Sequence, residues 1–395
     1  MDAILKPRTA EEIRDVVKWA AAEERPLEVI GSGSKRLLGR PVQVAHVLEL
    51  SDYSGVEFYE PAELVLTVKA GTPIKEIEKL VDDNGQELSF EPMDYGPLLG
   101  QPKAEGTIGG VIAANVSGPR RIKAGAARDH ILGLEAVSGR GEIFKSGGRV
   151  VKNVTGYDLP RGLCGSWGTL AVSTLITLKV NPKPETSATL LLEGLSDEDA
   201  ISALSKAMGS SAEVSGAAHL PAQEGGAAKT LFRLEGFETS IAYRAQTLTS
   251  LLADLGNVTR LNESETHATW DAIRNVDLFC GLPDPIWRIS VAPTAGVRLA
   301  NELRNQIGAK VFYDWSGGLV WLMCPNGKVH DQDIRAAVHK VGGGHATLVR
   351  ADAAIRSSVD VFQPQPTPLA ALSGRLKEQF DPNGILNPGR MTAGQ

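Results

Sequence analysis

The chain has 395 residues, of which 42% are hydrophobic and 22% charged, and its formal net charge is −6. This length exceeds one compact core and favours two domains, while the negative balance, without a long basic run, excludes a general nucleic-acid surface. Three isolated cysteines, Cys164, Cys280 and Cys324, indicate a reducing compartment and no metal or iron–sulfur cluster held by this chain. With no signal-peptide pattern and no apolar run near 18 residues, we expect a cytoplasmic protein.

The N-terminal half alternates short strands with helices. Apolar residues at helical spacing predict a helix over 10–24, with Thr9 as its cap. Strands are expected at 26–31, 63–71, 86–92 and 170–180, and Thr72-Pro73 opens a second helix. Residues 131–145 predict a hairpin that turns at Gly139-Arg140-Gly141.

The clearest candidate for a domain boundary is Asn181-Pro182-Lys183-Pro184. Beyond it glycine becomes rarer and helices alternate regularly with strands. Helices are expected near 197–209, 238–255, 264–278, 296–307 and 331–341, and strands near 229–235, 286–292, 310–313, 319–324 and 345–350. This order predicts an α+β domain with a mostly antiparallel sheet. A proline-rich crossing at 362–368 leads to a last helix and the tail FDPNGILNPGRM.

The stretch GSGSKR, residues 31–36, resembles a dinucleotide fingerprint only in part. Gly31 and Gly33 provide G-x-G, but position 36 is Arg, and Gly39 and Pro41 interrupt any following helix. A Walker A loop is absent from the chain. Alone, this stretch is equally consistent with a tight surface turn.

A second loop, GTIGGVIAANVSGPRR at 106–121, favours a ligand. Its glycines leave backbone N–H groups open to close approach, and small Ala113 and Ala114 let a ligand lie against the backbone. Each charge-assisted N–H bond to a phosphate contributes about 1.5–3 kcal/mol, so several converging amides can hold a diphosphate. Two such loops suggest a nucleotide between two subdomains, although close glycine packing would explain any single residue.

A third element, KNVTGYDLPRGLCGSWGTLAVSTLITLKV at 152–180, makes the resemblance specific. The motif order of glycine loop, GxIGG loop, hairpin and GYDL…GSxGTL turn resembles the flavin domain shared by vanillyl-alcohol oxidase and p-cresol methylhydroxylase (PCMH) relatives. The phrases GSKRLLGRP, GPRR and GGGHATLVRAD and the tail FDPNGILNPGRM are similar to the FAD-binding subunits of bacterial glycolate oxidases.

The resemblance implies an α+β fold in which a two-subdomain PCMH-type FAD-binding domain at 1–182 precedes an α/β cap domain at 183–361. Residues 362–395 would return to the FAD domain. It also implies the residues that would contact FAD: Gly31, Ser32, Gly33, Ser34, Lys35, Gly106, Thr107, Gly109, Gly110, Asn115, Gly118, Gly156, Tyr157, Asp158, Gly165, Ser166, Gly168 and Asn387. Relatives that attach FAD covalently often carry His in the first loop or Cys in the second. This chain carries neither, which favours non-covalent FAD.

Oxidation of a 2-hydroxy acid needs a base for the hydroxyl proton and a cation for the carboxylate. His345 and Arg350 in GGGHATLVR are candidates, although a spacing of five places them on opposite faces of a strand. Arg274 and Arg288 are alternative clamps, and Arg121 could add charge from the flavin side. A lone strand histidine is more often structural, and exposed arginines mostly face solvent.

Hydroxy-acid dehydrogenases of this superfamily usually carry a G-D-G-N-x-H stretch, where this chain has GGGHATL. The departure favours an FAD-binding subunit of a glycolate dehydrogenase. It would work with a catalytic flavoprotein subunit and an iron–sulfur subunit, and reach a membrane only through that complex. Two alternatives stay open. One is a self-sufficient flavin oxidoreductase acting on glycolate, D-lactate or an alcohol, and the other is an assembly subunit with a vestigial cleft.

Overall fold

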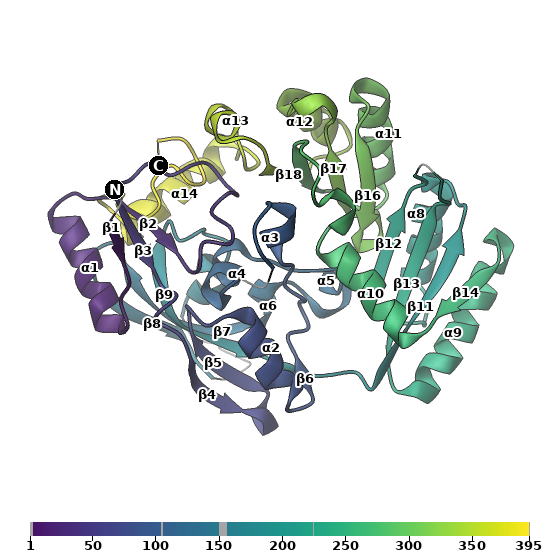
Figure 1. Cartoon of the computed structure of the whole chain (residues 1–395), viewed down its shortest axis with the longest axis horizontal. Coiled ribbons are helices and arrows are strands. Elements are labelled where there is room, and N and C mark those ends of the chain that lie inside the picture. The colour runs from purple at the N-terminus through teal and green to yellow at the C-terminus, as the bar shows by residue number, and fades with distance from the viewer. Residues whose placement is uncertain (1–2, 104–105, 150–155, 224, 395) are drawn as a thin grey trace. The chain divides into compact units, whose positions relative to one another are not determined.

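The computed structural model describes residues 3–103, 106–149, 156–223 and 225–394 (Figure 1). The chain divides into two compact units. The first contains Met1–Ser117, Gly125–Lys183 and Pro364–Gln395, and the second contains Gly118–Ala124 and Pro184–Gln363. The segment Gly118–Ala124 therefore groups with the second unit, whereas the sequence placed it within 1–182. The reason is long-range contacts, because Arg120 pairs with Glu235 and Ile122 packs against the second unit's core.

The first unit opens with a three-stranded parallel sheet in the order β1-β3-β2. Its strands are β1 (Ala3–Leu5), β2 (Leu27–Ile30) and β3 (His46–Glu49), and α1 (Ala10–Ala22) connects the first two. The predicted cap is confirmed, since Thr9 Oγ1 accepts from the Glu12 N–H at 3.1 Å. Ile13, Val17 and Ala20 form the buried stripe of α1. Strand β2 ends where the first glycine loop begins, at Gly31.

A five-stranded antiparallel sheet forms the other part of the first unit, in the order β4-β5-β9-β7-β8. Its strands are β4 (Val56–Glu60), β5 (Val65–Lys69), β7 (Ile131–Ser138), β8 (Ile143–Gly147) and β9 (Ala171–Lys179), and the predicted β7–β8 hairpin is confirmed. The strand expected at 86–92 is wrong beyond β6 (Gln86–Glu87), which pairs with β10 (Asn181–Pro182). There the Glu91 N–H donates to Leu88 O at 3.0 Å, so a turn ends the strand.

Beside α1, the first unit has two longer helices, α2 (Ile74–Asp82) and α14 (Thr367–Phe380). Its short helices are α3 (Tyr95–Leu98), α4 (Ile108–Ala114), α6 (Ala127–His130) and α7 (Leu159–Leu163), and a 3-10 turn lies at Pro61–Glu63. The last helix is held by Lys377, which donates to Thr169 O at 2.7 Å and to Asp381 Oδ2 at 2.6 Å. The C-terminal tail is thereby fixed to the first unit.

The second unit is built on one eight-stranded antiparallel sheet in the order β14-β11-β13-β12-β16-β17-β15-β18. Its strands are β11 (Thr186–Glu193), β12 (Gly216–Leu220), β13 (Lys229–Gly236), β14 (Val258–Leu261), β15 (Ile286–Ser290), β16 (Lys310–Asp314), β17 (Leu319–Met323) and β18 (His345–Arg350). The five strands expected from the sequence are present. Three others, β11, β12 and β14, were not predicted, and β12 is the clearest case because its GAAHL has no bulky β-branched residue.

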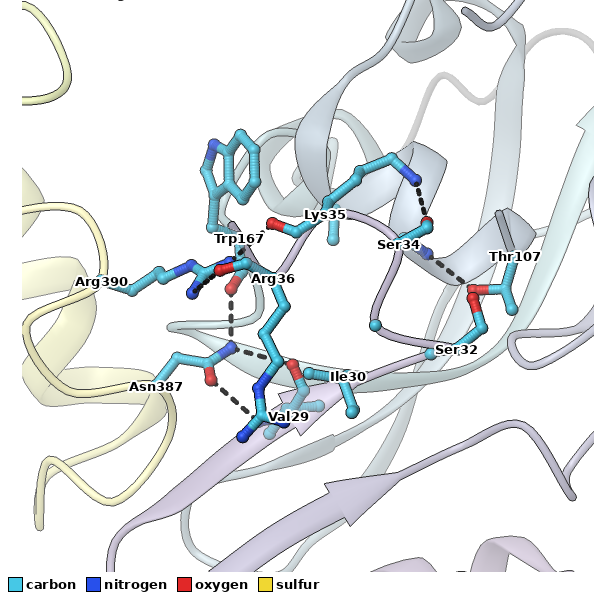
Figure 2. A pocket seen from close by; sticks show the side chains of 14 residues that line it. Val29, Ile30, Ser32, Ser34, Lys35, Arg36, Thr107, Trp167, Asn387 and Arg390 are labelled. Carbon is cyan, nitrogen blue, oxygen red and sulfur yellow. Dashed lines mark hydrogen bonds between the residues drawn. The ribbon is translucent and has the colours of Figure 1, made fainter. Parts of the chain in front are cut away.

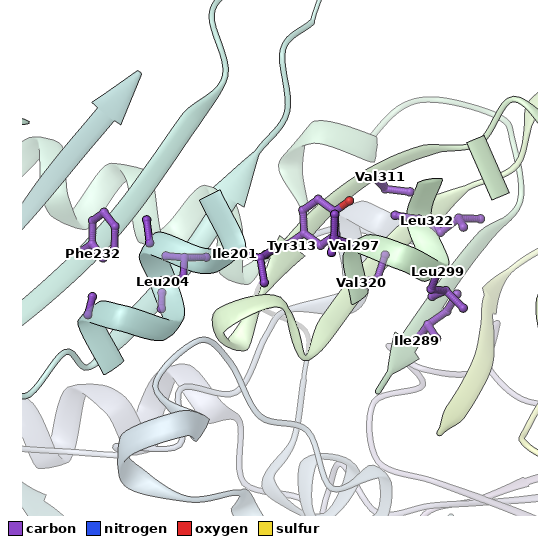
Figure 3. Packing of buried hydrophobic residues seen from close by; sticks show 14 of the residues in the cluster. Ile201, Leu204, Phe232, Ile289, Val297, Leu299, Val311, Tyr313, Val320 and Leu322 are labelled. Carbon is purple, nitrogen blue, oxygen red and sulfur yellow. The ribbon is translucent and has the colours of Figure 1, made fainter. Parts of the chain in front are cut away.

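Helices cover one face of this sheet. They are α8 (Asp197–Met208), α9 (Glu238–Leu252), α11 (Ala295–Ile307) and α12 (Asp331–Lys340), and their apolar residues join one buried cluster with alternate strand residues (Figure 3). The opposite face contacts α10 (Glu263–Arg274), whose Trp270 Nε1 donates to Thr189 Oγ1 at 2.9 Å. The second unit also includes α5 (Arg121–Ala124) and α13 (Ala353–Ser358). Its 3-10 turns lie at Ala253–Leu255, Asp277–Phe279, Trp315–Gly317 and Pro325–Gly327. No described helix is long and apolar enough to cross a membrane.

Candidate FAD site

A pocket of about 70 Å³ lies in the first unit where the loop after β2 meets the start of α4 (Figure 2). It is lined by Val29, Ile30, Gly31, Ser32, Gly33, Ser34, Lys35, Arg36, Thr107, Gly110, Ala113, Trp167, Asn387 and Arg390. A second pocket shares Gly31, Gly110 and Trp167 with it and extends to Gly109, Ser166 and Gly168. The three glycine-rich stretches of the sequence thus meet at one continuous site.

Glycine allows the first two loops to approach each other. A Cβ on Gly31 would lie 2.0 Å from Thr107 Oγ1, a distance that no side chain can accept. Thr107 is itself fixed, because it is 3% exposed and its Oγ1 accepts from the Gly110 N–H at 3.3 Å as the N-cap of α4. The close contact leaves the backbone of both loops facing the pocket.

Lys35 places a positive charge in this pocket. Burial lowers the pKa of Lys35 to about 8, because desolvation disfavours the ammonium, and the negative field of Asp94 only partly opposes that effect. Within the described residues its Nζ contacts Ser34 Oγ at 3.4 Å, with no carboxylate at ion-pair distance. A Cβ on Gly110 would lie 3.4 Å from that Nζ, so the missing side chain leaves space beside the ammonium. A pyrophosphate fits this charge and this space.

The C-terminal tail closes the pocket from another side. Asn387, 3% exposed, accepts from the Val29 N–H at 2.8 Å through Oδ1 and donates to Trp167 O at 2.8 Å through Nδ2. Arg390 donates to Lys35 O at 2.9 Å and lies 5.9 Å from the centre of the Trp167 ring. Asn387 therefore lines the pocket while its side chain is used to hold the loops together.

Sequence reasoning anticipated Ala113 but missed Val29, Ile30, Arg36, Trp167 and Arg390 as lining residues. The available signal was proximity, since each lies within or next to a stretch that had been singled out. Trp167 adopts φ 56°, and nothing in the residue type indicates this left-handed backbone.

Several predicted FAD residues lie elsewhere. Asn115 Oδ1 accepts from the Arg128 N–H at 3.1 Å and caps α4, so its side chain serves the loop structure. Tyr157 is 88% exposed and lies outside both pockets, as do Gly156 and Asp158, whose carboxylate caps α7. Residues 152–155 of the same motif lie outside the described residues. Gly106 lies beside Lys35 at the edge of the first pocket, whereas Gly165, whose neighbour is Asn115, lines neither pocket.

The last of the predicted FAD residues, Gly118, belongs to the second unit. Its carbonyl accepts from Trp315 Nε1 at 3.0 Å, which fixes the backbone of the Gly118–Ala124 segment. Gly118 therefore holds the Trp315 indole in place through its backbone carbonyl.

The four catalytic candidates occupy different environments in the second unit. Arg350 donates to Asp284 O at 2.8 Å and to Phe279 O at 3.1 Å, so its guanidinium holds two loops. Arg274 pairs with Asp271 on its own helix at 3.0 Å. His345 is exposed and pairs across the sheet with Ser290. Arg288 is partly buried against the Trp315 ring, 4.9 Å from its centre.

The spacing argument for His345 and Arg350 is changed by a register shift. The β15–β18 ladder shifts between Ile286 and Trp287, so regular alternation does not run from one residue to the other. Arg350 is nevertheless occupied with backbone carbonyls, and the two side chains do not form a shared site.

Similarity to known proteins agrees with this geometry. A family model described as an FAD binding domain matches residues 1–147. Among solved structures, 4-ethylphenol oxidase from Gulosibacter chungangensis matches with a TM-score of 0.72 at 14% identity, and p-cresol methylhydroxylase matches with 0.69 at 15%. Each match covers 98% of this chain and 88% of the other. The chain therefore contains an FAD-binding domain and has the PCMH-type fold, as predicted.

Proteins with similar sequences identify the family within this fold. The glycolate oxidase subunit GlcE of Escherichia coli (strain K12) is 34% identical over 378 residues, covering 95% of each chain. The chain belongs to this glycolate oxidase subunit family. The glycolate oxidase subunit GlcD of Bacillus subtilis (strain 168) is 34% identical over 191 residues, which cover 48% of this chain and 39% of GlcD. The D-lactate dehydrogenase of Archaeoglobus fulgidus is 34% identical over 200 residues, which cover 50% of this chain and 43% of that enzyme.

Proposed function

We propose that this chain is the FAD-binding subunit of a glycolate oxidase complex, which oxidises glycolate to glyoxylate and passes the electrons to partner subunits. The observation that carries the proposal is similarity along 95% of the chain to a protein named as a glycolate oxidase subunit. The glycine pocket with its partly buried Lys35 supports it independently, because a small cationic cradle suits the pyrophosphate of FAD.

In this proposal the first loop and α4 hold the pyrophosphate. Gly31–Ser34 and Gly110 line the pocket that would receive it, and the Lys35 ammonium would supply the counter-charge. Bound FAD would supply a two-electron acceptor for a hydride. In the alternative of a self-sufficient dehydrogenase, the exposed His345 would accept the hydroxyl proton of the substrate.

FAD would be held without a covalent bond. Covalent attachment to cysteine needs a reactive thiol, and burial raises the pKa of the Cys164 thiol to about 12. Its Sγ also lies 3.6 Å from Asn115 Oδ1. Precipitation with acid should therefore release all of the flavin into the supernatant, whereas yellow colour retained in the protein pellet would contradict non-covalent binding.

The electrons would leave through partner subunits. The three cysteines are free, and within the described residues no group of three His, Cys, Asp or Glu side chains is placed to hold a metal ion. We propose that an iron–sulfur subunit and a second, catalytic flavoprotein subunit complete the chain of transfer. Any attachment to a membrane would come through that complex.

One experiment tests this function. The visible spectrum of the purified chain should show bound FAD, and glycolate should bleach that spectrum when the partner subunits are present. Bleaching by glycolate with the isolated chain would favour a self-sufficient dehydrogenase. A colourless protein that takes up no FAD on reconstitution would instead favour an assembly subunit with a vestigial cleft.

A further inference from the structure

The parallel sheet of the first unit has an open edge at β1. Its strand order is β1-β3-β2, so β1 has a described neighbour on one side only. The opposite edge, at β2, is covered by the tail, since the Leu27 N–H donates to Ile385 O at 2.7 Å. The Ala3 N–H donates to Ala45 O at 3.1 Å, toward β3. Because successive residues of a parallel strand bond to opposite sides, the N–H and C=O of Ile4 point to the open edge and can accept an added strand.

A groove of about 470 Å³ lies between β1 and α1, two elements that Figure 1 shows in the first unit. It is lined by Leu5, Lys6, Pro7, Glu12, Asp15, Val16 and Trp19. Leu5 and Val16 are partly buried, and Trp19 is 40% exposed. The Trp19 indole lies edge-on against His46, with ring centres 5.0 Å apart. The groove therefore offers an oriented aromatic ring and aliphatic side chains next to the open edge.

The groove is negatively charged. Its one cation, Lys6, is paired at 2.8 Å with Glu49, which does not line the groove. The Glu12 carboxylate accepts a backbone N–H at 2.6 Å, and a backbone amide adds no charge. Asp15 is paired with its neighbour Arg14 at 2.8 Å, but both side chains are exposed enough for such a pair to contribute little. Two carboxylates are thus available to a cation that enters the groove.

An added strand would place its side chains in register with these features. Leu5 lines the groove, so alternate side chains of a neighbouring strand would point to the same side, toward Val16 and Trp19. The others would lie beside Ile4, which is 56% exposed. An arginine suits the groove because its planar guanidinium can stack on an indole and pair with a carboxylate at once.

We propose that an extended segment of a partner subunit adds to β1 as a strand and places an arginine against Trp19, beside Asp15. The occupant is a partner subunit because the chain belongs to a family of oxidase subunits, and an acidic groove selects a basic segment. This inference rests on the proposed function, in which electrons leave through partner subunits. None of the groove residues lines either FAD pocket, so docking and FAD binding can be tested separately.

Binding of the FAD-loaded full chain to the separately purified catalytic flavoprotein and iron–sulfur subunits, measured by biolayer interferometry, tests this docking face. Trp19→Ala and Asp15→Lys should each weaken binding to one of these subunits about tenfold or more. Ile4→Pro should do the same, since it removes the N–H that points to the open edge and keeps the bonds to β3. Tyr243→Ala, at an exposed aromatic residue of α9, and Glu76→Lys, on the exposed side of α2, are the matched controls and should bind as wild type does.

FAD content and melting temperature should be equal in wild type, Trp19→Ala and Asp15→Lys, so that a loss of binding reports the surface alone. Replacing basic residues of the partner segment one at a time by glutamate should identify one change that restores binding to Asp15→Lys. That rescue would show a direct ion pair, which a general loss of stability cannot produce.

Two results would overturn the docking face: wild-type affinity in both Trp19→Ala and Ile4→Pro, or no binding of either subunit by the wild-type chain. If the chain alone forms a dimer that these variants dissociate, a second copy occupies the groove and the assignment to a partner subunit is wrong. A complex that bleaches with glycolate and assembles equally well with these variants keeps the proposed function and rejects the docking face. If the variants lose the partner but the wild-type complex never bleaches, the docking face stands and the proposed function fails.

Discussion

Lys35 offers the sharpest test of the FAD site. Its ammonium is partly buried beside the Gly110 backbone with a pKa near 8, and the substitution Lys35→Met keeps the length of the side chain while removing the charge. A charge-assisted contact to an ionised group contributes about 1.5–3 kcal/mol, so FAD should bind about ten- to a hundredfold more weakly. Lys75→Met, on the exposed side of α2 in the same unit, is the matched control.

The dependence of FAD affinity on pH shows whether the charge of the Lys35 ammonium is responsible for the effect. Below pH 8 Lys35 is protonated in the free protein, so FAD affinity should be constant there. Above pH 8 the free protein loses this proton, and binding of the pyrophosphate must restore it, so affinity should fall by up to about tenfold per pH unit. Titration of the apoprotein with FAD from pH 6.5 to 9.5, followed by flavin fluorescence, gives both readouts. Equal affinity and equal pH profiles in wild type and Lys35→Met would refute this account.

Two further substitutions test packing and electrostatics. Gly31→Ala places a Cβ 2.0 Å from Thr107 Oγ1, so overpacking should cost about 1–3 kcal/mol and lower both the melting temperature and the FAD content, while Gly148→Ala, where nothing lies within 4 Å, serves as control. Burial acts to raise the pKa of Asp197, but hydrogen bonds from His219, Tyr313 and Arg304 outweigh it and hold that pKa at about 2. A depressed carboxyl pKa stabilises the fold above its unfolded value near 3.8, so Asp197→Asn should lose about 2 kcal/mol at pH 7. The gap to wild type in denaturant unfolding should shrink as pH falls from 4 toward 2, and a gap independent of pH would contradict the ionic explanation.

The glycine loops show how far residue order alone can go. Gly31, Gly110 and Gly168 were singled out because they lie in small-residue stretches, and all three line the pockets of the first unit. Tyr157 and Asp158 came from an equally distinctive motif, yet they lie outside those pockets. A motif reports that a backbone shape recurs, and it does not report which of its side chains faces the ligand.

The arginines show the opposite case. Arg288 and Arg350 look equivalent in the sequence, each on a strand with apolar neighbours. Their difference arises from the register of β15, β17 and β18, which places Arg288 beside Thr347 and near Trp315 while Arg350 reaches the Phe279 and Asp284 carbonyls. Side-chain partners across a sheet are separated by tens of residues along the chain, and local patterns carry no information about them.

Local properties of the sequence, namely glycine at close approaches, apolar spacing and capping residues, indicated most of the helices and strands and the glycine loops that meet at the pocket. The class of the protein was indicated by the resemblance of its motifs to a known flavoprotein family. Only the tertiary structure decided that Arg390 and Asn387 hold the first loop, and that Gly118–Ala124 leaves the first unit for the second. It also decided which arginines gather at Trp315. Such choices follow from long-range packing and hydrogen bonding between segments that only the folded chain brings together.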